Sequence, residues 1–213
     1  MRTRRLAHGW ELTGLPGLSP HLVAEFIRPA LRAVPGSLAA RLGPCRISLP
    51  ARLPNPDLSS RWTQTGERLE IEVATEGTEE HDVAMEVLLC LGQALWETAG
   101  PGDRTAYLKL LLEEIEAEVS GEIDEQALEE KRLVLASRLS ARSSRRLQRY
   151  ARASFAGTLA EYLHCLWHDV TIRTGPDHLP ALWLRRRLET LAGWFPPDRG
   201  YRLFAPKTRT AGR

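Results

Sequence analysis

The alternating segment at residues 68–73, followed by a long stretch with helical periodicity, constrains the fold of this chain most. Leu69, Ile71 and Val73 alternate with Glu70 and Glu72, a pattern typical of a strand with one buried and one wet face. From about residue 78 onward the spacing of apolar residues indicates helices at 79–98, 103–119, 123–150, 153–169 and 178–194. A small strand-containing N-terminal half packed on a mostly helical body predicts the α+β class.

The residues before this strand are predicted to be less regular. Glycines and prolines interrupt residues 1–19, which we interpret as an N-terminal arm. Ser19 and Pro20 are typical of a helix start, and we expect that helix to reach about residue 34. Residues 46–50 form a short candidate strand. The predicted organisation is an arm at 1–19, a single α+β domain at 20–205 and a disordered tail at 206–213.

Composition places the chain among ordinary globular proteins. Its 213 residues are 43% hydrophobic and 26% charged, which is typical of one soluble domain. The three cysteines have no C-x-x-C spacing, and this favours a reducing compartment. We recognise no signal peptide and no apolar run long enough for a membrane span. The sequence therefore predicts a cytoplasmic protein without membrane contact, and its preference for Arg, Ala and Leu over Lys and Ile indicates a GC-rich bacterial genome.

Residues 88–96, in the predicted helix 79–98, read Leu-Leu-Cys-Leu-Gly-Gln-Ala-Leu-Trp. This segment resembles the central helix of the zincin metallopeptidases, whose H-E-x-x-H motif often extends to H-E-L-G-H-A-L and supplies two zinc-binding histidines and a general-base glutamate. In that frame Leu89 replaces the first histidine, Cys90 the glutamate and Gln93 the second histidine. Leucine cannot bind a metal and glutamine is a poor substitute for imidazole. The resemblance therefore implies a cleft that has lost its zinc chemistry and holds no cofactor.

Residues 154–162, Ser-Phe-Ala-Gly-Thr-Leu-Ala-Glu-Tyr, resemble the later helix from which gluzincins supply their third zinc ligand, within an F-x-x-x-x-A-E-x pattern. Glu161 matches that ligand and is the only one retained. The resemblance covers residues 68–97 and 154–165, and it also implies that the strand at 69–73 is the substrate-binding edge of the cleft. We therefore expect a degenerate, non-catalytic zincin-like domain, a pseudoenzyme. Its vestigial cleft is marked by Leu89, Cys90, Gln93 and Glu161.

A metal-dependent hydrolase with a rearranged site is an alternative. Glu161, His164 and His168 share one face of the predicted helix 153–169, and Glu-x-x-His spacing binds metals in helix bundles when other helices add ligands. Such a site would centre on Glu161 and His164, with Cys90 or His168 converging on them. A polar face of a surface helix explains the same pattern. His81 is not expected to meet Cys90, because nine residues of helix place them on opposite sides.

A second alternative is a basic helical module that binds nucleic acid. Arginines occupy positions 138, 142, 145, 146, 149, 152 and 185–187, and clustered arginines can follow phosphates. Glutamates in the preceding helices can pair with them, and the net charge is only +2. We therefore expect no nucleic-acid partner and consider a protein or peptide the partner class that remains. No feature of the sequence fixes the oligomeric state.

Overall fold

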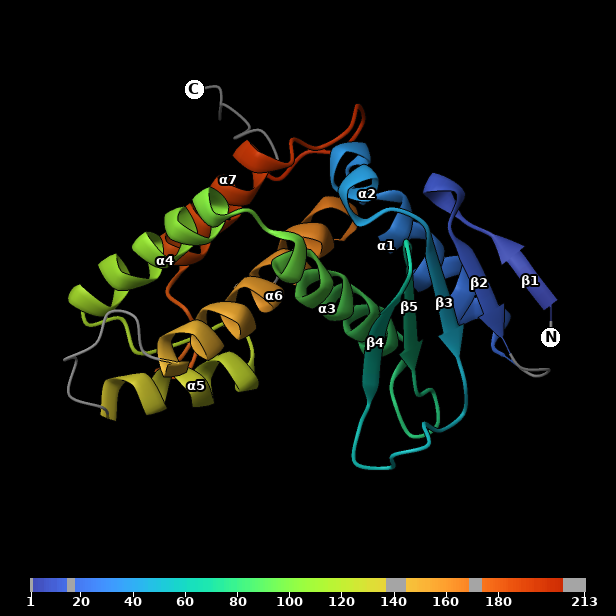
Figure 1. Ribbon diagram of the computed structural model, residues 1–213, viewed down its shortest axis with the longest axis horizontal. Helices are drawn as coiled ribbons and strands as arrows, with labels where there is room; N and C mark the ends of the chain where they lie inside the picture. The colour runs from blue at the N-terminus through green and yellow to red at the C-terminus, as the bar shows by residue number, and fades with distance from the viewer. Residues whose placement is uncertain (1, 15–17, 137–144, 169–173, 205–213) are drawn as a thin grey trace, which may run out of the picture.

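A computed structural model describes residues 2–14, 18–136, 145–168 and 174–204. Its strands are β1 (Arg2–Arg5), β2 (Glu11–Gly14), β3 (Cys45–Leu49), β4 (Ser60–Thr65) and β5 (Arg68–Val73). A π-helical segment at Leu22–Ile27 precedes the helices α1 (Arg28–Arg32), α2 (Gly36–Leu42), α3 (Glu80–Thr98), α4 (Pro101–Glu116), α5 (Glu125–Ala136), α6 (Arg145–Trp167) and α7 (Ala181–Trp194). The class is α+β, as predicted. The sheet forms one end of the molecule, α4, α5 and α7 the other, and α3 and α6 lie between (Figure 1).

The five strands form one mixed sheet in the order β1-β2-β3-β5-β4. The inner pairs β2–β3 and β3–β5 are parallel, whereas the outer pairs β1–β2 and β4–β5 are antiparallel. In β5 the predicted alternation is confirmed, since Leu69, Ile71 and Val73 are fully buried and the glutamates between them are not. The helices therefore cover one face of the sheet, and α3 contacts both β4 and β5.

The expected N-terminal arm is wrong for residues 2–14, which form β1, a 3-10 turn at Ala7–Gly9 and β2. Trp10, which is 1% exposed, anchors this segment by donating from Nε1 to the carbonyl oxygen of Gly43 at 3.0 Å. The two strands were missed because each has four residues and little apolar alternation. Pairing of β1 with β2, and of β2 with β3, stabilises them. The expected tail at 206–213 lies outside the described residues.

The edge of the sheet also differs from the expectation. β5 has a neighbour on both sides, so it is not the edge strand that the zincin resemblance implies; β4 occupies that position. A hairpin turn containing Gly66, with a φ of 62°, joins β4 to β5. The sequence did not predict β4, because most side chains of this strand are polar and exposed, as is usual for an edge strand.

In the helical body, the predicted helix 79–98 corresponds to α3 and the predicted 178–194 to α7. The break expected between residues 150 and 153 is wrong, because α6 continues through Ala151 and Arg152. Of the single helix expected at 123–150, the described residues contain α5 (Glu125–Ala136) and the start of α6, and residues 137–144 lie outside them. Every helix in the described residues is too short or too polar to cross a membrane.

Candidate functional site

The site is built on the close approach of α3 and α6, which form the most extensive helix pair of the protein. A Cβ atom on Gly92 would lie only 2.7 Å from Cα of Ala156, so the two backbones pack together at this point. From that contact the helices run antiparallel, because residues early in α3 meet residues late in α6. The arrangement places the zincin-like frame of α3 beside the segment of α6 that carries Glu161.

A cavity of about 620 Å³ lies beside these helices. α3 forms one wall, α6 the second, and residues 122–125 with residues 178–179 form the third. Six carboxyl side chains line it: Asp82, Glu86, Glu122, Asp124, Glu125 and Glu161. Among the described residues no lysine or arginine side chain lines it, and its remaining surface includes Met85, Leu89 and Leu184. The cavity is therefore acidic, with apolar patches.

The structure brings together some of the sequence-predicted site residues. Leu89 and Glu161 line the same cavity, as do His164 and His168. Gln93 does not line it: its side-chain oxygen accepts a hydrogen bond of 3.0 Å from Nε1 of Trp62 in β4. The second histidine position of the zincin frame is thus used to tie α3 to the edge strand.

Cys90 is also turned away from the cavity. It is 1% exposed, and burial raises the pKa of its thiol to about 12. Ser60 of β4 lies close enough to hydrogen bond with the thiol, and the hydroxyl of Ser60 also donates to Glu86 at 2.5 Å. A neutral thiol packed between a helix and a sheet is a core side chain and not a nucleophile.

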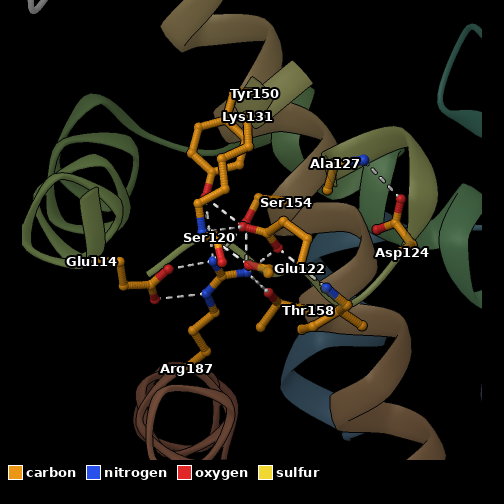
Figure 2. A network of polar contacts seen from close by, with 12 residues as sticks. Glu114, Ser120, Glu122, Asp124, Ala127, Lys131, Tyr150, Ser154, Thr158 and Arg187 are labelled. Atoms are coloured by element: carbon orange, nitrogen blue, oxygen red, sulfur yellow. Dashed lines mark hydrogen bonds and ion pairs between the residues drawn. The ribbon is translucent and has the colours of Figure 1, made fainter. Parts of the chain in front are cut away.

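A buried ionic network holds the third wall in place. Figure 2 shows the guanidinium of Arg187 between Glu114 and Glu122. All three side chains are fully buried. Arg187 donates to Glu114 Oε1 at 2.8 Å, and to Glu122 Oε1 and Oε2 at 2.7 and 2.8 Å. Lys131 Nζ donates to the carbonyl of Gly121 at 2.9 Å, and the hydroxyl of Tyr150 donates to Glu122. This network joins α4, α5, α6 and α7 around residues 121–122.

The charges of this network compensate one another. Burial would raise the pKa of Glu122, but the charge of Arg187 and its hydrogen bonds outweigh burial and lower that pKa to about 2. Glu122 is therefore ionised and fully paired. Although it lines the cavity, its charge is already balanced by Arg187 and Lys131, so its role is to fix the wall.

Asp124 comes two residues after Glu122 and, unlike Glu122, has no ion pair with an arginine or lysine among the described residues. Its Oδ1 accepts from the backbone N–H of Ala127 at 3.0 Å and caps α5. Its Oδ2 is buried and has no hydrogen-bond partner among the described residues. Burial raises the pKa of Asp124 to about 6. A Cβ atom on Gly157 would lie 2.0 Å from Oδ2, so this glycine makes room for the carboxyl group against α6.

Histidines gather where the start of α3 meets the end of α6. His81 Nε2 lies 3.1 Å from His164 Nε2. The ring of His168 stacks on that of His164, with centroids 5.2 Å apart and planes inclined by 12°. Sequence reasoning missed His81, because it was weighed only as a partner for Cys90. The antiparallel contact of Gly92 with Ala156 explains the pair. His81 comes eleven residues before Gly92 in α3 and His164 comes eight residues after Ala156 in α6, so both lie on the same side of the contact.

Four of the arginines considered for nucleic-acid binding pair with glutamates outside their own helix. Arg149 lies 3.4 Å from Glu130, and Arg152 lies 3.3 Å from Glu97. Arg186 pairs with Glu113, and Arg187 is inside the buried network. Arg138 and Arg142 lie outside the described residues. The guanidinium groups of Arg149, Arg152, Arg186 and Arg187 therefore already have carboxylate partners.

Comparisons with known protein families, with curated proteins and with solved structures give no match to this chain.

Proposed function

We propose that this protein is a non-catalytic, zincin-like binding domain whose cavity receives a positively charged segment of a protein or peptide. The observation that carries the proposal is the lining of the cavity, which has five carboxyl groups besides the already paired Glu122 and no described lysine or arginine. Carboxylates in a concave site concentrate the electric field and attract cations. The resemblance of residues 88–96 and 154–162 to zincin helices supports a peptide as the ligand, because zincins hold peptides beside these helices.

The shape of the lining suits lysine or arginine side chains. Asp82 and Glu86 come from α3, whereas Asp124 and Glu125 lie on the opposite wall. Met85, Leu89 and Leu184 add apolar surface between them, against which an aliphatic stem can pack while its charged head reaches a carboxylate.

Peptide hydrolysis at the zincin position is not part of the proposal. Leu89 offers no electron pair, Cys90 faces the sheet with a protonated thiol, and the amide of Gln93 is occupied by Trp62. The three cysteines are free and buried, which supports a cytoplasmic location.

The test is a binding measurement with labelled peptides of equal length, one rich in lysine and arginine and one rich in aspartate and glutamate. We expect the basic peptide to bind at least about tenfold more tightly, a difference of about 1.4 kcal/mol, and the difference to shrink as salt rises. The double variant Glu86→Gln with Glu125→Gln should weaken binding of the basic peptide.

The matched control is Glu67→Gln with Glu129→Gln, which changes the net charge equally at two exposed positions that do not line the cavity. It should bind like the unaltered protein. Equal affinity for both peptides, or equal loss in both double variants, would contradict a cavity that selects cations.

A further inference from the structure

Two imidazole nitrogens face each other in the cavity, away from the positions that the zincin frame would use. His81 lies in the first turn of α3 and His164 in the last turn of α6. Their Nε2 atoms are 3.1 Å apart. Two nitrogens bound to one tetrahedral Zn²⁺ at about 2.0–2.1 Å lie about 3.3–3.4 Å apart. The observed separation therefore needs only a few tenths of an ångström of adjustment to hold a metal ion.

The other nitrogen of each ring lies near a carboxylate, within hydrogen-bond distance for His81 and beyond it for His164. His81 Nδ1 is 3.4 Å from Oδ1 of Asp82, and His164 Nδ1 is 3.9 Å from Oε2 of Glu161. Histidines that bind metals commonly present the N–H of the second nitrogen to a carboxylate, which fixes the tautomer and leaves the lone pair on the first. Without a metal, one Nε2 donates to the other over 3.1 Å. When both rings carry their proton on Nδ1, both Nε2 lone pairs become available, and a cation placed beside them takes over the role of that hydrogen bond.

We propose that His81 and His164 bind a divalent transition-metal ion such as Zn²⁺, with His168 as the third ligand. Imidazole suits zinc, copper and nickel, and the carboxylates of the cavity attract cations. Among the described residues, no group of three histidine, cysteine or acidic side chains is arranged to bind a metal ion. A third ligand must therefore move towards His81 and His164 when the ion binds. His168 can supply it by rotating its side chain, since it is exposed and directly follows α6.

His168 is well placed for this role. It follows His164 by one helical turn, and its backbone N–H donates to the His164 carbonyl at 2.9 Å. Side chains four residues apart on a helix share a face. The ring of His168 is 6.1 Å from that of His81, measured between centroids. The three rings are thus neighbours, and an ion bound by them after rotation of His168 would fasten the start of α3 to the end of α6.

The experiment is a calorimetric titration of Zn²⁺ into the chelator-treated full chain. We expect one ion per chain and a higher Tm in the presence of Zn²⁺, because an ion that binds only the folded state stabilises it. His81→Asn and His164→Asn should each weaken binding at least about tenfold, and Asp82→Asn should weaken it towards the lower end of the 10–100-fold range found for partners of metal-binding histidines.

The matched control is His8→Asn. His8 lies in the turn after β1 with a φ of 57°, a conformation that asparagine tolerates well, and it should not affect binding. Circular dichroism of the metal-free variants separates lost binding from lost folding. His81, whose side chain is 34% exposed, is the safer of the two ligand positions. Absence of zinc binding to the unaltered chain, or unchanged affinity in folded His81→Asn, would overturn the proposal.

Discussion

Gly92 of α3 and Ala156 of α6 bring two helix backbones into direct contact, since a Cβ atom on Gly92 would lie 2.7 Å from Cα of Ala156 and 2.8 Å from its carbonyl oxygen. Backbone atoms cannot move aside as a side-chain tip can. The glycine of the Leu-Gly-x-Ala-Leu frame is therefore needed for packing, whatever chemistry the frame carries. Leu91, on its N-terminal side, is fully buried.

Gly92→Ala should lower the free energy of unfolding by about 1–3 kcal/mol, because the added methyl group forces α3 and α6 apart. Urea denaturation measures the change. Gly193→Ala is the control: this glycine is also helical, in α7, but a Cβ atom there has no described neighbour within 4 Å. That variant should be neutral or slightly more stable, because alanine favours a helix. A Gly92→Ala protein as stable as the control would mean that the helices do not pack this closely.

Arg187→Met should destabilise the fold strongly, by about 3–5 kcal/mol, because it leaves the carboxylates of Glu114 and Glu122 buried without their main partner. Arg132→Met removes an exposed ion pair, 2.7 Å from Asp177 with both side chains about 60% exposed, and should cost at most about 1 kcal/mol. Thermal denaturation of both variants checks the contrast. Similar losses would show that the Arg187 network contributes little.

Because the pKa of Asp124 is raised by folding, we expect the protein to lose stability as the pH rises. Its pKa is raised to about 6 in the folded protein and is about 3.9 in an unfolded chain. The folded state therefore holds the proton more tightly than the unfolded chain does. The stabilisation of the folded state that results is complete below about pH 4 and is lost as the pH rises through 6. The shift corresponds to about 2–3 kcal/mol.

Asp124→Asn keeps a good helix cap for α5 but cannot ionise. The variant should lack the part of the pH dependence that Asp124 causes between about pH 4 and 6, and urea denaturation across that range measures it. If the free energy of unfolding of the variant changed with pH as steeply as that of the unaltered protein, groups other than Asp124 would cause the pH dependence.

Leu89→His with Gln93→His should create a zinc site together with Glu161, if the backbone keeps zincin geometry. The measurement is zinc titration in the His81→Asn background, which removes the other pair of histidines. Adding Glu161→Gln should weaken the new site. A folded variant that gains no zinc affinity would count against the zincin interpretation. Cys90 is left unchanged because a charged glutamate at a position only 1% exposed would be costly.

The sequence alone determined the elements whose pattern is strong and local. β5 and α3 follow directly from apolar periodicity, and the α+β class follows from their order. The polar face with Glu161, His164 and His168 also follows from helical spacing, since the three side chains line one cavity. These features depend on neighbours within a few turns of the same segment.

Only the tertiary structure decided what depends on partners far along the chain. The short strands β1 and β2 and the polar edge strand β4 exist because other strands pair with them. The pairing of His81 with His164, 83 residues away, depends on where α3 meets α6. The same holds for Arg187, whose carboxylate partners Glu114 and Glu122 are 73 and 65 residues away. Spacing along one helix fixes which side chains share a face, but the distance between two helices is set by packing, here by the absence of a side chain at Gly92.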